Sequence, residues 1–466
     1  MTSTEPRATS AAFSPSDGSG EPTLARRLGA FDATMIVMGG IIGAGIFVNP
    51  SVVARQVHTP GLVLGAWIIG GAIALIGAFV YAELAALRPR VGGQYAYLRD
   101  AYHPIVAFLY GWTLLLVVQT GGMAGAAIIF GRYFRELSGL GISEQIAAAL
   151  TLGILTLVNC LGVRAGSNVQ SALMITKLAA ILGLVGVGLF LTPSATASAP
   201  TPETTTSSGG LAGLATAMVP VLFAYGGWQT SSFVSGEMKN PRRDLPRGLL
   251  IGVIGVIVLY LSVTFVCLRS LGVDGLAATS TPASEVMRRA LGDRGARLIA
   301  LGIAVSTVGF LSQSVLTAPR VYYAMARDGV FFKAVGTLNP KSRVPVVAIV
   351  LQGVWAAVIA LTGKYDQILN YVEAIDVLFF GLTGASLIIF RMRARKTGDD
   401  DEERTRVPLH PITTAVFVLA CWLISLTTVV RYPAHAGVGF GILLVGVAVY
   451  FLWARHGAPR SGSDAV

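Results

Sequence analysis

The stretch MGGIIGAGIF, at residues 38–47, places four glycines within an otherwise apolar segment. A second apolar segment reads PVLFAYGGW at residues 220–228 and contains paired glycines at the corresponding point. Glycine weakens a helix, because it has no side chain to pack and loses the most conformational freedom on folding. The sequence therefore predicts two helices that are broken at matching positions.

The rest of the chain has the composition of a membrane protein. Of its 466 residues 53% are hydrophobic and 13% are charged, with a mean hydropathy of +0.67, whereas a soluble domain carries about 25% charged residues. Roughly 20 apolar residues cross a bilayer as a helix. The predicted fold class is an all-α integral membrane protein without a separate soluble domain. Its apolar runs predict about 12 transmembrane helices, near 31–56, 62–87, 104–131, 145–162, 168–192, 211–236, 247–269, 298–326, 345–363, 367–390, 411–430 and 437–454.

The net charge of +11 reports topology and does not indicate nucleic-acid binding. With the N-terminus placed in the cytoplasm, 24 of the 35 Lys and Arg residues fall in segments on that side and 10 on the other, and Lys177 lies within a span. Such an excess on one side is the positive-inside rule. Both termini are therefore predicted to be cytoplasmic, in a multi-pass protein of the plasma (cell inner) membrane.

The two breaks divide the chain into two comparable blocks. Gly43 and Gly226 are 183 residues apart, and five predicted spans fall in each block. An odd number of spans turns the second block upside down, and paired broken helices in inverted halves mark a transporter's binding site. The predicted organisation is a disordered cytoplasmic tail, a first inverted repeat, an external loop, a second inverted repeat, helices 11 and 12, and a cytoplasmic tail, at residues 1–28, 29–192, 193–208, 209–391, 392–456 and 457–466.

Backbone groups freed at the two breaks match the charges of an amino acid. The amides of Gly43 to Gly45 lie at the positive end of a half-helix that begins near Ile46, which suits a carboxylate. The carbonyls of Phe223, Ala224 and Tyr225 lie at the negative end of the other half-helix, which suits an ammonium. Glycines in membrane helices also serve close helix packing, but the matched pair of breaks favours a binding role.

At these residues the chain resembles the amino acid–polyamine–organocation superfamily of transporters, and within it the L-type amino acid transporter branch. The resemblance covers residues 24–456. The motifs that carry it are GAGIF at 43–47, GGQY at 92–95, FAYGGW at 223–228, GEMKNPRR at 236–243 and PRVYYAMARDG at 319–329. Ala44 stands where that branch often has serine, so a hydroxyl is missing from the first motif.

The resemblance implies the leucine-transporter fold of five-plus-five inverted repeats, with helices 1 and 6 broken. It also implies that these two helices bind the amino acid backbone and that Phe223 lies over the substrate on the external side. Weaker candidates for the side-chain pocket are polar residues of the third and eighth helices. The predicted substrate-binding residues are Ile42, Gly43, Ala44, Gly45, Phe223, Ala224, Tyr225 and Gly226, with Gln119, Ser312 and Gln313 as the pocket candidates.

Lys177 lies about ten residues inside the fifth predicted span. A lysine near a membrane surface can extend its ammonium to the headgroups, but a charge at this depth is functional by default. In sodium-independent members of the superfamily, a lysine at the matching place stands where sodium-coupled relatives bind the ion. The resemblance therefore implies that Lys177 is a cation surrogate that holds the first break, and that transport is sodium-independent.

Three further carboxylates lie in or near predicted spans. Glu83 is predicted to pair with a cytoplasmic base. Glu373 and Asp376 are three positions apart and share a helix face. They either line an external vestibule or pair with Lys364 or Arg431.

The sequence argues against an enzyme and against a metal or cofactor. A membrane enzyme needs a nucleophile with its base, a metal cluster or paired intramembrane aspartates, and the five histidines all lie in loops or at span ends. An ion channel would need a filter loop or a ring of charged residues, and the sequence shows neither. The three cysteines fall inside spans, and residues 132–144 lack the cysteine that joins two-subunit animal members to a heavy-chain glycoprotein. No disulfide-linked heavy chain is therefore expected.

The predicted function is secondary active transport of amino acids by alternating access, as a sodium-independent exchanger of small or medium neutral L-amino acids. A proton-coupled amino acid symporter and an exchanger of polyamines or cationic amino acids remain open. A polytopic membrane enzyme is the alternative from a different class.

Overall fold

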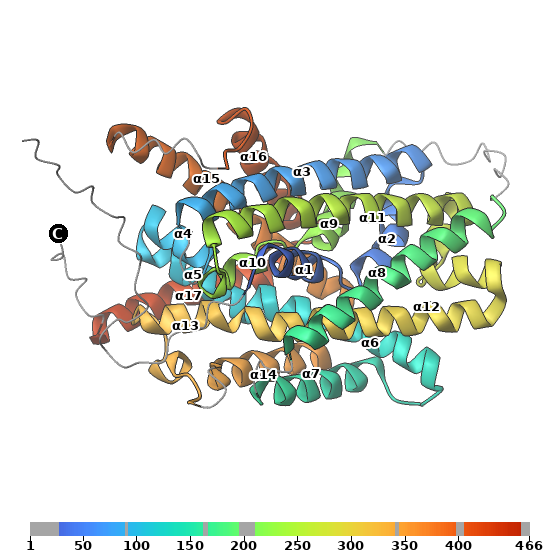
Figure 1. Cartoon of the computed structure of the whole chain (residues 1–466), viewed down its shortest axis with the longest axis horizontal. Coiled ribbons are helices and arrows are strands. Elements are labelled where there is room, and N and C mark those ends of the chain that lie inside the picture. Colours follow the sequence, from blue (N-terminus) through green and yellow to red (C-terminus); the bar gives the residue numbers. More distant parts are fainter. Residues whose placement is uncertain are drawn as a thin grey trace, which may run out of the picture.

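The computed structural model describes residues 28–88, 92–161, 166–194, 210–340, 344–397 and 405–457. Nearly all of the tails predicted at 1–28 and 457–466, and of the loop predicted at 193–208, lies outside these residues. Within the described part the regular elements are helices, and one isolated bridge joins Leu28 to Met238. The prediction of an all-α fold is confirmed (Figure 1).

The first half of the chain contains the first broken helix and the elements that follow it. These are α1 (Ala30–Ile41), η1 (Gly45–Phe47), α2 (Asn49–Val57), α3 (Pro60–Leu87), α4 (Gln94–Ala101), α5 (Pro104–Thr113), η2 (Leu114–Val118), α6 (Gln119–Ser138), α7 (Glu144–Cys160) and α8 (Gly166–Phe190).

The second half contains the second broken helix, the long helices α11, α12 and α15, and two helices that end the chain. Its elements are α9 (Leu211–Tyr225), α10 (Thr230–Phe233), η4 (Ser235–Glu237), α11 (Pro241–Ala278), α12 (Pro282–Thr317), α13 (Pro319–Arg327), η5 (Lys333–Gly336), α14 (Val346–Thr362), α15 (Tyr365–Thr397), α16 (Ile412–Arg431) and α17 (Pro433–Gly457).

Prolines set where many of these helices begin. Pro60, Pro104, Pro241 and Pro282 each lie in the first turn of a helix. Proline is tolerated there because its missing amide would have had no partner within the helix and its φ angle is already helical. The apolar runs between these starts then continue as long helices.

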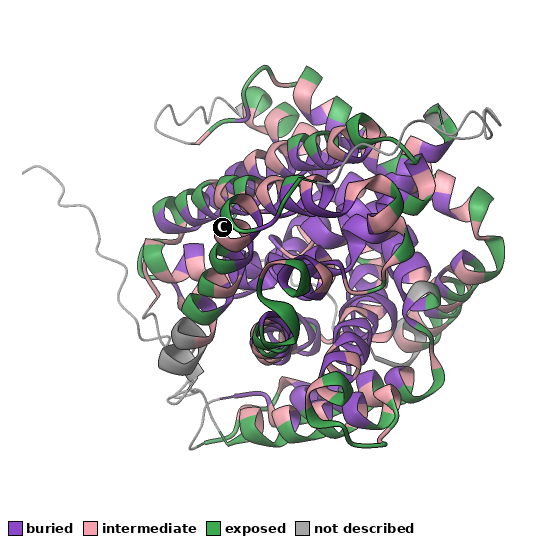
Figure 2. Ribbon diagram, turned by 90° about the vertical axis from the view of Figure 1, so that its right-hand side faces the viewer, coloured by how far each residue is buried: buried purple, intermediate pink, exposed green. Residues whose placement is uncertain are grey.

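The outer surface of the bundle is apolar, and its centre is buried (Figure 2). Large hydrophobic side chains that are exposed occur on many helices, for example Leu157 on α7, Ile251 on α11 and Leu423 on α16. An apolar surface this extensive marks contact with a non-aqueous environment. Among the described residues, eight helices are long and apolar enough to cross a membrane, and α1, α7 and α14 are shorter apolar helices.

Helices occupy all 12 predicted ranges, although the number that crosses a bilayer stays a prediction. Residues 270–297, between the seventh and eighth predicted spans, are largely helical. The chain turns within this segment at Gly272 and Gly292, whose φ angles are +70° and +65°. Glycine adopts this left-handed conformation at little cost, so the chain kinks at both positions.

The broken helix α1 lies in the middle of the bundle, where longer helices surround it (Figure 1). It packs against α11, α12 and α8, and α11 in turn packs along α3. Helix α12 contacts α6 and α8, and α15 contacts α6, α9 and α16. The two breaks are thereby enclosed by helices from both halves of the chain.

Ion pairs tie the helices together at the end of the bundle that holds α4 and α13. Glu83 accepts two hydrogen bonds of 2.6 Å from Arg391 and one of 2.7 Å from the amide of Val407. The predicted pairing of Glu83 with a base is confirmed. The Arg320 Nε atom lies 3.0 Å from a carboxylate oxygen of Glu237.

Candidate functional site

The first break lies between α1 and η1. Helix α1 ends because Ile42 is extended (φ −74°, ψ 91°), and the chain turns again into η1 at Gly45. The turns of η1 are closed by hydrogen bonds from Phe47 to Ala44 and from Val48 to Gly45. The first amides of such a helical turn have no partner within it, so the amides of Gly45 and Ile46 are available to a ligand.

Lys177 on α8 binds this break directly. Its Nζ atom donates hydrogen bonds to the carbonyl oxygens of Ile42 at 2.8 Å and Gly39 at 3.3 Å, and the side chain is fully buried. The Tyr260 hydroxyl donates to the carbonyl of Ile41 at 3.0 Å. The carbonyls freed by the break therefore have protein partners, which removes most of the cost of an open helix turn in an apolar environment.

The second break follows Tyr225, the last residue of α9. Gly227 has a φ of +107°, in the region that favours glycine. Its amide donates to Oε1 of Gln229 at 3.0 Å, and its carbonyl accepts from the Thr230 hydroxyl at 2.8 Å. Side chains of α10 and its flank thus stabilise this turn.

The two breaks touch each other through glycine. A Cβ atom built on Gly40 would lie 2.7 Å from the carbonyl oxygen of Gly227, and one on Gly45 would lie 3.3 Å from Cα of Ala224. Asn49 adds a polar link, because its side-chain nitrogen donates to the Pro220 carbonyl at 2.8 Å. A larger residue at Gly40 or Gly45 would push the two broken helices apart.

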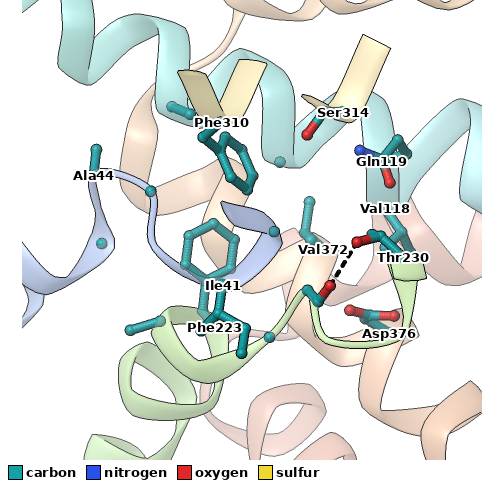
Figure 3. A pocket seen from close by; sticks show the side chains of 18 of the residues that line it. Ile41, Ala44, Val118, Gln119, Phe223, Thr230, Phe310, Ser314, Val372 and Asp376 are labelled. Atoms are coloured by element: carbon teal, nitrogen blue, oxygen red, sulfur yellow. Dashed lines mark hydrogen bonds between the residues drawn. The ribbon is translucent and has the colours of Figure 1, made fainter. Parts of the chain in front are cut away.

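A cavity opens between the breaks, and the volume that the centre of a water molecule can reach in it is about 80 Å³. Figure 3 shows side chains from α1, α6, α9, α12 and α15 converging on this space. The lining residues are Gly40, Ile41, Gly43, Ala44, Gly45, Val118, Gln119, Gly122, Ala126, Ile129, Phe223, Ala224, Gly226, Gly227, Gln229, Thr230, Phe310, Ser314, Tyr365, Val372, Glu373 and Asp376.

Most of the predicted binding residues meet at this cavity. Those that line it are Gly43, Ala44, Gly45, Gln119, Phe223, Ala224 and Gly226. The ring of Phe223 also forms an edge-to-face pair with Tyr365, with centroids 6.4 Å apart. Residues of the first, third and sixth predicted spans are thus brought to one place.

Four predicted residues lie outside the lining. The Ile42 carbonyl is bound by Lys177, the Tyr225 hydroxyl donates to Trp67, and Gln313 donates to the Ile36 carbonyl. Ser312 also does not line the cavity. On α12 the lining residues are Phe310 and Ser314, and residues four apart share a helix face. Ser312, two positions from each of them, is therefore turned away by helix geometry, whereas the Gln313 side chain is held by the Ile36 carbonyl.

Neither predicted environment of Glu373 and Asp376 on α15, an external vestibule or a pairing with a basic residue, is confirmed. Glu373 and Asp376 line the same cavity as the two breaks, with 3% and 9% of their surfaces exposed. Among the described residues, no ion pair joins either carboxylate to Lys364 or Arg431. Two acidic residues in an apolar segment were the available signal, but the sequence did not show that α15 turns them inward.

Other lining residues were not anticipated. Tyr365 begins α15 and donates to the side-chain oxygen of Asn49 at 3.2 Å. Beside Gln119, the segment η2 is a turn of π-helix, and the Thr120 hydroxyl donates to the Leu115 carbonyl at 2.6 Å. Single π-helical turns occur often at functional sites. Neither feature leaves a pattern in the amino-acid sequence.

A second cavity shares Tyr365 with the first. The centre of a water molecule can reach about 440 Å³ of it, and its wall includes Arg55, Arg132 and Lys364 as well as Glu144. Three basic side chains thus line an open space that shares Tyr365 with the inner cavity.

Comparison with known proteins decides the family of the chain. Residues 28–463 match the family described as "Amino acid permease". The chain belongs to this permease family. It is 31% identical over 457 residues to the large neutral amino acids transporter small subunit 2 of Mus musculus, which covers 94% of this chain and 82% of that protein.

Two further relatives cover most of their own length as well. The permease is 29% identical over 436 residues to the serine/threonine exchanger SteT of Bacillus subtilis, covering 92% of this chain and 97% of that one. It is 28% identical over 464 residues to the b(0,+)-type amino acid transporter 1 of Rattus norvegicus, covering 97% and 90%. The predicted resemblance to L-type transporters of the amino acid–polyamine–organocation superfamily is confirmed.

These relatives are named as transporters and not as enzymes. Among the described residues, no group of three or more His, Cys, Asp and Glu side chains is placed to hold a metal ion. All three cysteines have free thiols. The expectation that no heavy chain is attached by a disulfide stays a prediction.

Proposed function

We propose that this permease is a secondary active transporter of amino acids, and that it exchanges small or medium neutral L-amino acids without sodium. The cavity between the two breaks carries the proposal, because it places free amides and helix-end carbonyls around one small space. Relatives named as a large neutral amino acid transporter, a serine/threonine exchanger and a b(0,+)-type amino acid transporter support amino acids as the substrate class.

The substrate carboxylate binds at the first break in this proposal. The amides of Gly45 and Ile46 have no partner within η1, and the partial positive charge of a helix start attracts an anion. Because Ala44 has no hydroxyl, recognition here comes from backbone amides. The glycines allow the carboxylate to approach these amides closely.

The substrate ammonium binds at the second break. Helix α9 ends at Tyr225, and carbonyl oxygens at a helix end carry partial negative charge. Ala224 and Gly226 line the cavity at this end, and the Phe223 ring covers the same space. The distance between the two breaks then selects α-amino acids, because both charged groups of one molecule must be satisfied together.

Lys177 replaces a bound sodium ion in this account. Its ammonium already occupies the carbonyls of Ile42 and Gly39 that an ion would need. An ion at the same position would have to displace a fully buried cation. We therefore infer sodium-independent transport.

The arrangement in the membrane is also a proposal. We infer 12 transmembrane helices, with residues 29–192 and 209–391 as inverted repeats, helices 11 and 12 in residues 392–456, and both termini in the cytoplasm of the cell inner membrane. The second cavity, with Arg55, Arg132 and Lys364, then forms an external vestibule. Tyr365 separates this vestibule from the substrate site and serves as its outer gate.

Substrate size tests whether this cavity is the pocket. Gly122 lines it, and a Cβ atom added there meets no atom within 4 Å, so a side chain would fill the cavity without disturbing the fold. We expect Gly122→Val to keep uptake of L-alanine and to lose L-leucine and L-phenylalanine. The ratio of uptake rates should shift by about tenfold or more, because one or two carbons in a pocket are worth about 1–3 kcal/mol.

The measurement is uptake of a series of labelled amino acids into liposomes that contain equal amounts of each variant. Gly153→Val is the matched control, because Gly153 is exposed on α7 and its added Cβ also meets nothing within 4 Å. An unchanged size preference in Gly122→Val would place the substrate pocket elsewhere.

A proton-coupled symporter is the second candidate function. Glu373 and Asp376 favour it, because they bring two carboxyl groups into the proposed substrate cavity. A carboxyl group that gains and loses a proton can link transport to a pH gradient.

A further inference from the structure

Glu373 and Asp376 form a buried acidic pair in the cavity wall. They are three positions apart on α15, so their Cβ atoms are about 5–6 Å apart. Both line the cavity, and both are more than nine-tenths buried. Figure 3 shows Asp376 directed toward the side of the cavity where Thr230 lies.

No described basic side chain forms an ion pair with this acidic pair. The buried ammonium of Lys177 is committed to the carbonyls of Ile42 and Gly39 and does not line the cavity. Lys364 precedes α15 and lines the second cavity. Two ionised carboxylates this close in a buried site repel each other, so a positive charge must join them.

The other titratable groups around the pair are ordinarily neutral near pH 7. Tyr81 on α3, Tyr110 on α5 and Cys421 on α16 lie close enough to interact electrostatically with the acidic pair. Tyr365 lines the same cavity. Tyrosine and cysteine ordinarily lose their protons only near pH 10 and about 8.5, respectively. None of these side chains supplies the missing positive charge.

A side-chain amide without a hydrogen-bond partner among the described residues points to a ligand in the same cavity. The Gln119 side chain lines the cavity, is 8% exposed, and makes no hydrogen bond to another described residue. Buried polar side chains almost always have a partner. The wall around the acidic pair is therefore built for polar occupants that protein groups do not provide.

We propose that Glu373 and Asp376 form a proton-binding site in the substrate cavity, and that a neutral amino acid binds while this pair holds a proton. The inference rests on the proposed function, because it requires the cavity to be the amino acid site. A zwitterion adds its own carboxylate to a space that already holds two, and its single ammonium cannot offset three negative charges. A proton taken from solvent by one carboxylate removes part of this repulsion. Substrate binding and proton binding then favour each other.

The expected result is pH-dependent binding of a neutral amino acid to the purified full chain. The apparent Kd for labelled L-alanine should rise with pH, by up to about tenfold per pH unit once the pair has lost its proton. At a pH above that at which the empty pair loses its proton, binding of L-alanine should also take up close to one proton, which a pH indicator detects in weakly buffered solution. A merely structural role of the pair would produce no such uptake.

Variants that imitate the protonated pair sharpen the test. Glu373→Gln and Asp376→Asn, alone and together, keep the size of each side chain and remove its titration. The double variant should bind L-alanine independently of pH, close to the affinity of the parent at acid pH, without proton uptake. Asp293→Asn is the matched control, because this carboxylate is 85% exposed, and it should behave like the parent. If the double variant does not fold, the single variants and the proton uptake of the parent still decide.

The remaining outcomes would overturn either the proton site or the proposed function. L-Alanine binding to the parent that does not change with pH, or that takes up no proton at a pH where the empty pair has lost its own, overturns the proton site and leaves the proposed function standing. Tight L-lysine binding that needs both carboxylates and takes up no proton overturns it too, because the pair would then hold a cationic side chain. No amino acid binding at any pH, by folded parent and variants alike, would instead contradict the proposed function.

Discussion

Replacing Lys177 with alanine is expected to reduce transport by at least about tenfold while the protein still folds and inserts. The substitution leaves the carbonyls of Ile42 and Gly39 without their buried partner. Each unpaired carbonyl costs about 1–3 kcal/mol, and about 1.4 kcal/mol is a tenfold change in an equilibrium. The break then samples other conformations, and a smaller fraction of the protein has the site assembled.

The measurement is the rate of amino acid exchange in liposomes that contain equal amounts of folded protein. Lys333→Ala is the matched control, because Lys333 is an exposed lysine on η5, and it should transport at the rate of the parent. A Lys177→Ala protein within about twofold of that rate would show that Lys177 is a packing residue. The inference of sodium independence would then lose its structural basis.

Replacing Gly45 with valine is expected to abolish substrate binding. A Cβ atom at this position already lies 3.3 Å from Cα of Ala224 and 3.5 Å from the Asn49 amide nitrogen. The two further methyl groups of valine separate η1 from α9 or block the amides of the first break. Overpacking of this kind costs about 1–3 kcal/mol before the lost contacts of the carboxylate are counted.

Equilibrium binding of a labelled neutral amino acid to the purified variant tests this expectation. Gly183→Val is the matched control, because Gly183 is exposed on α8 and has open space around its added Cβ. Gly45→Ala should lie between the parent and the valine variant. An unchanged affinity in Gly45→Val that has folded would remove the first break from the binding site.

The sequence predicted the parts of the fold that depend on local patterns. The apolar runs located helices at all 12 ranges, and the glycines at 43–45 and 226–227 located both breaks, because each signal lies within one turn or one span. The kinks at Gly272 and Gly292 were missed for the opposite reason. A single glycine between helical segments resembles a loop until its backbone conformation is known.

The site was predicted best where the backbone forms it. The residues of the two breaks line the cavity through their backbone. The position of a break is set by the local glycines and does not depend on the direction of any side chain. Side chains from α12 and α15 depend on the rotation of each helix about its axis. Ser314 lines the cavity where Ser312 was expected, and the acidic pair was expected elsewhere, because polarity alone does not fix that rotation.

Exchange without sodium is the central claim, and one measurement tests it most directly. Liposomes that contain the purified permease are loaded with a labelled neutral amino acid in sodium-free buffer, and its efflux is followed when the unlabelled amino acid is added outside. The account predicts efflux that starts on this addition, saturates with its concentration and does not change when sodium is supplied. Efflux that requires sodium, or that is the same without external amino acid, would contradict it.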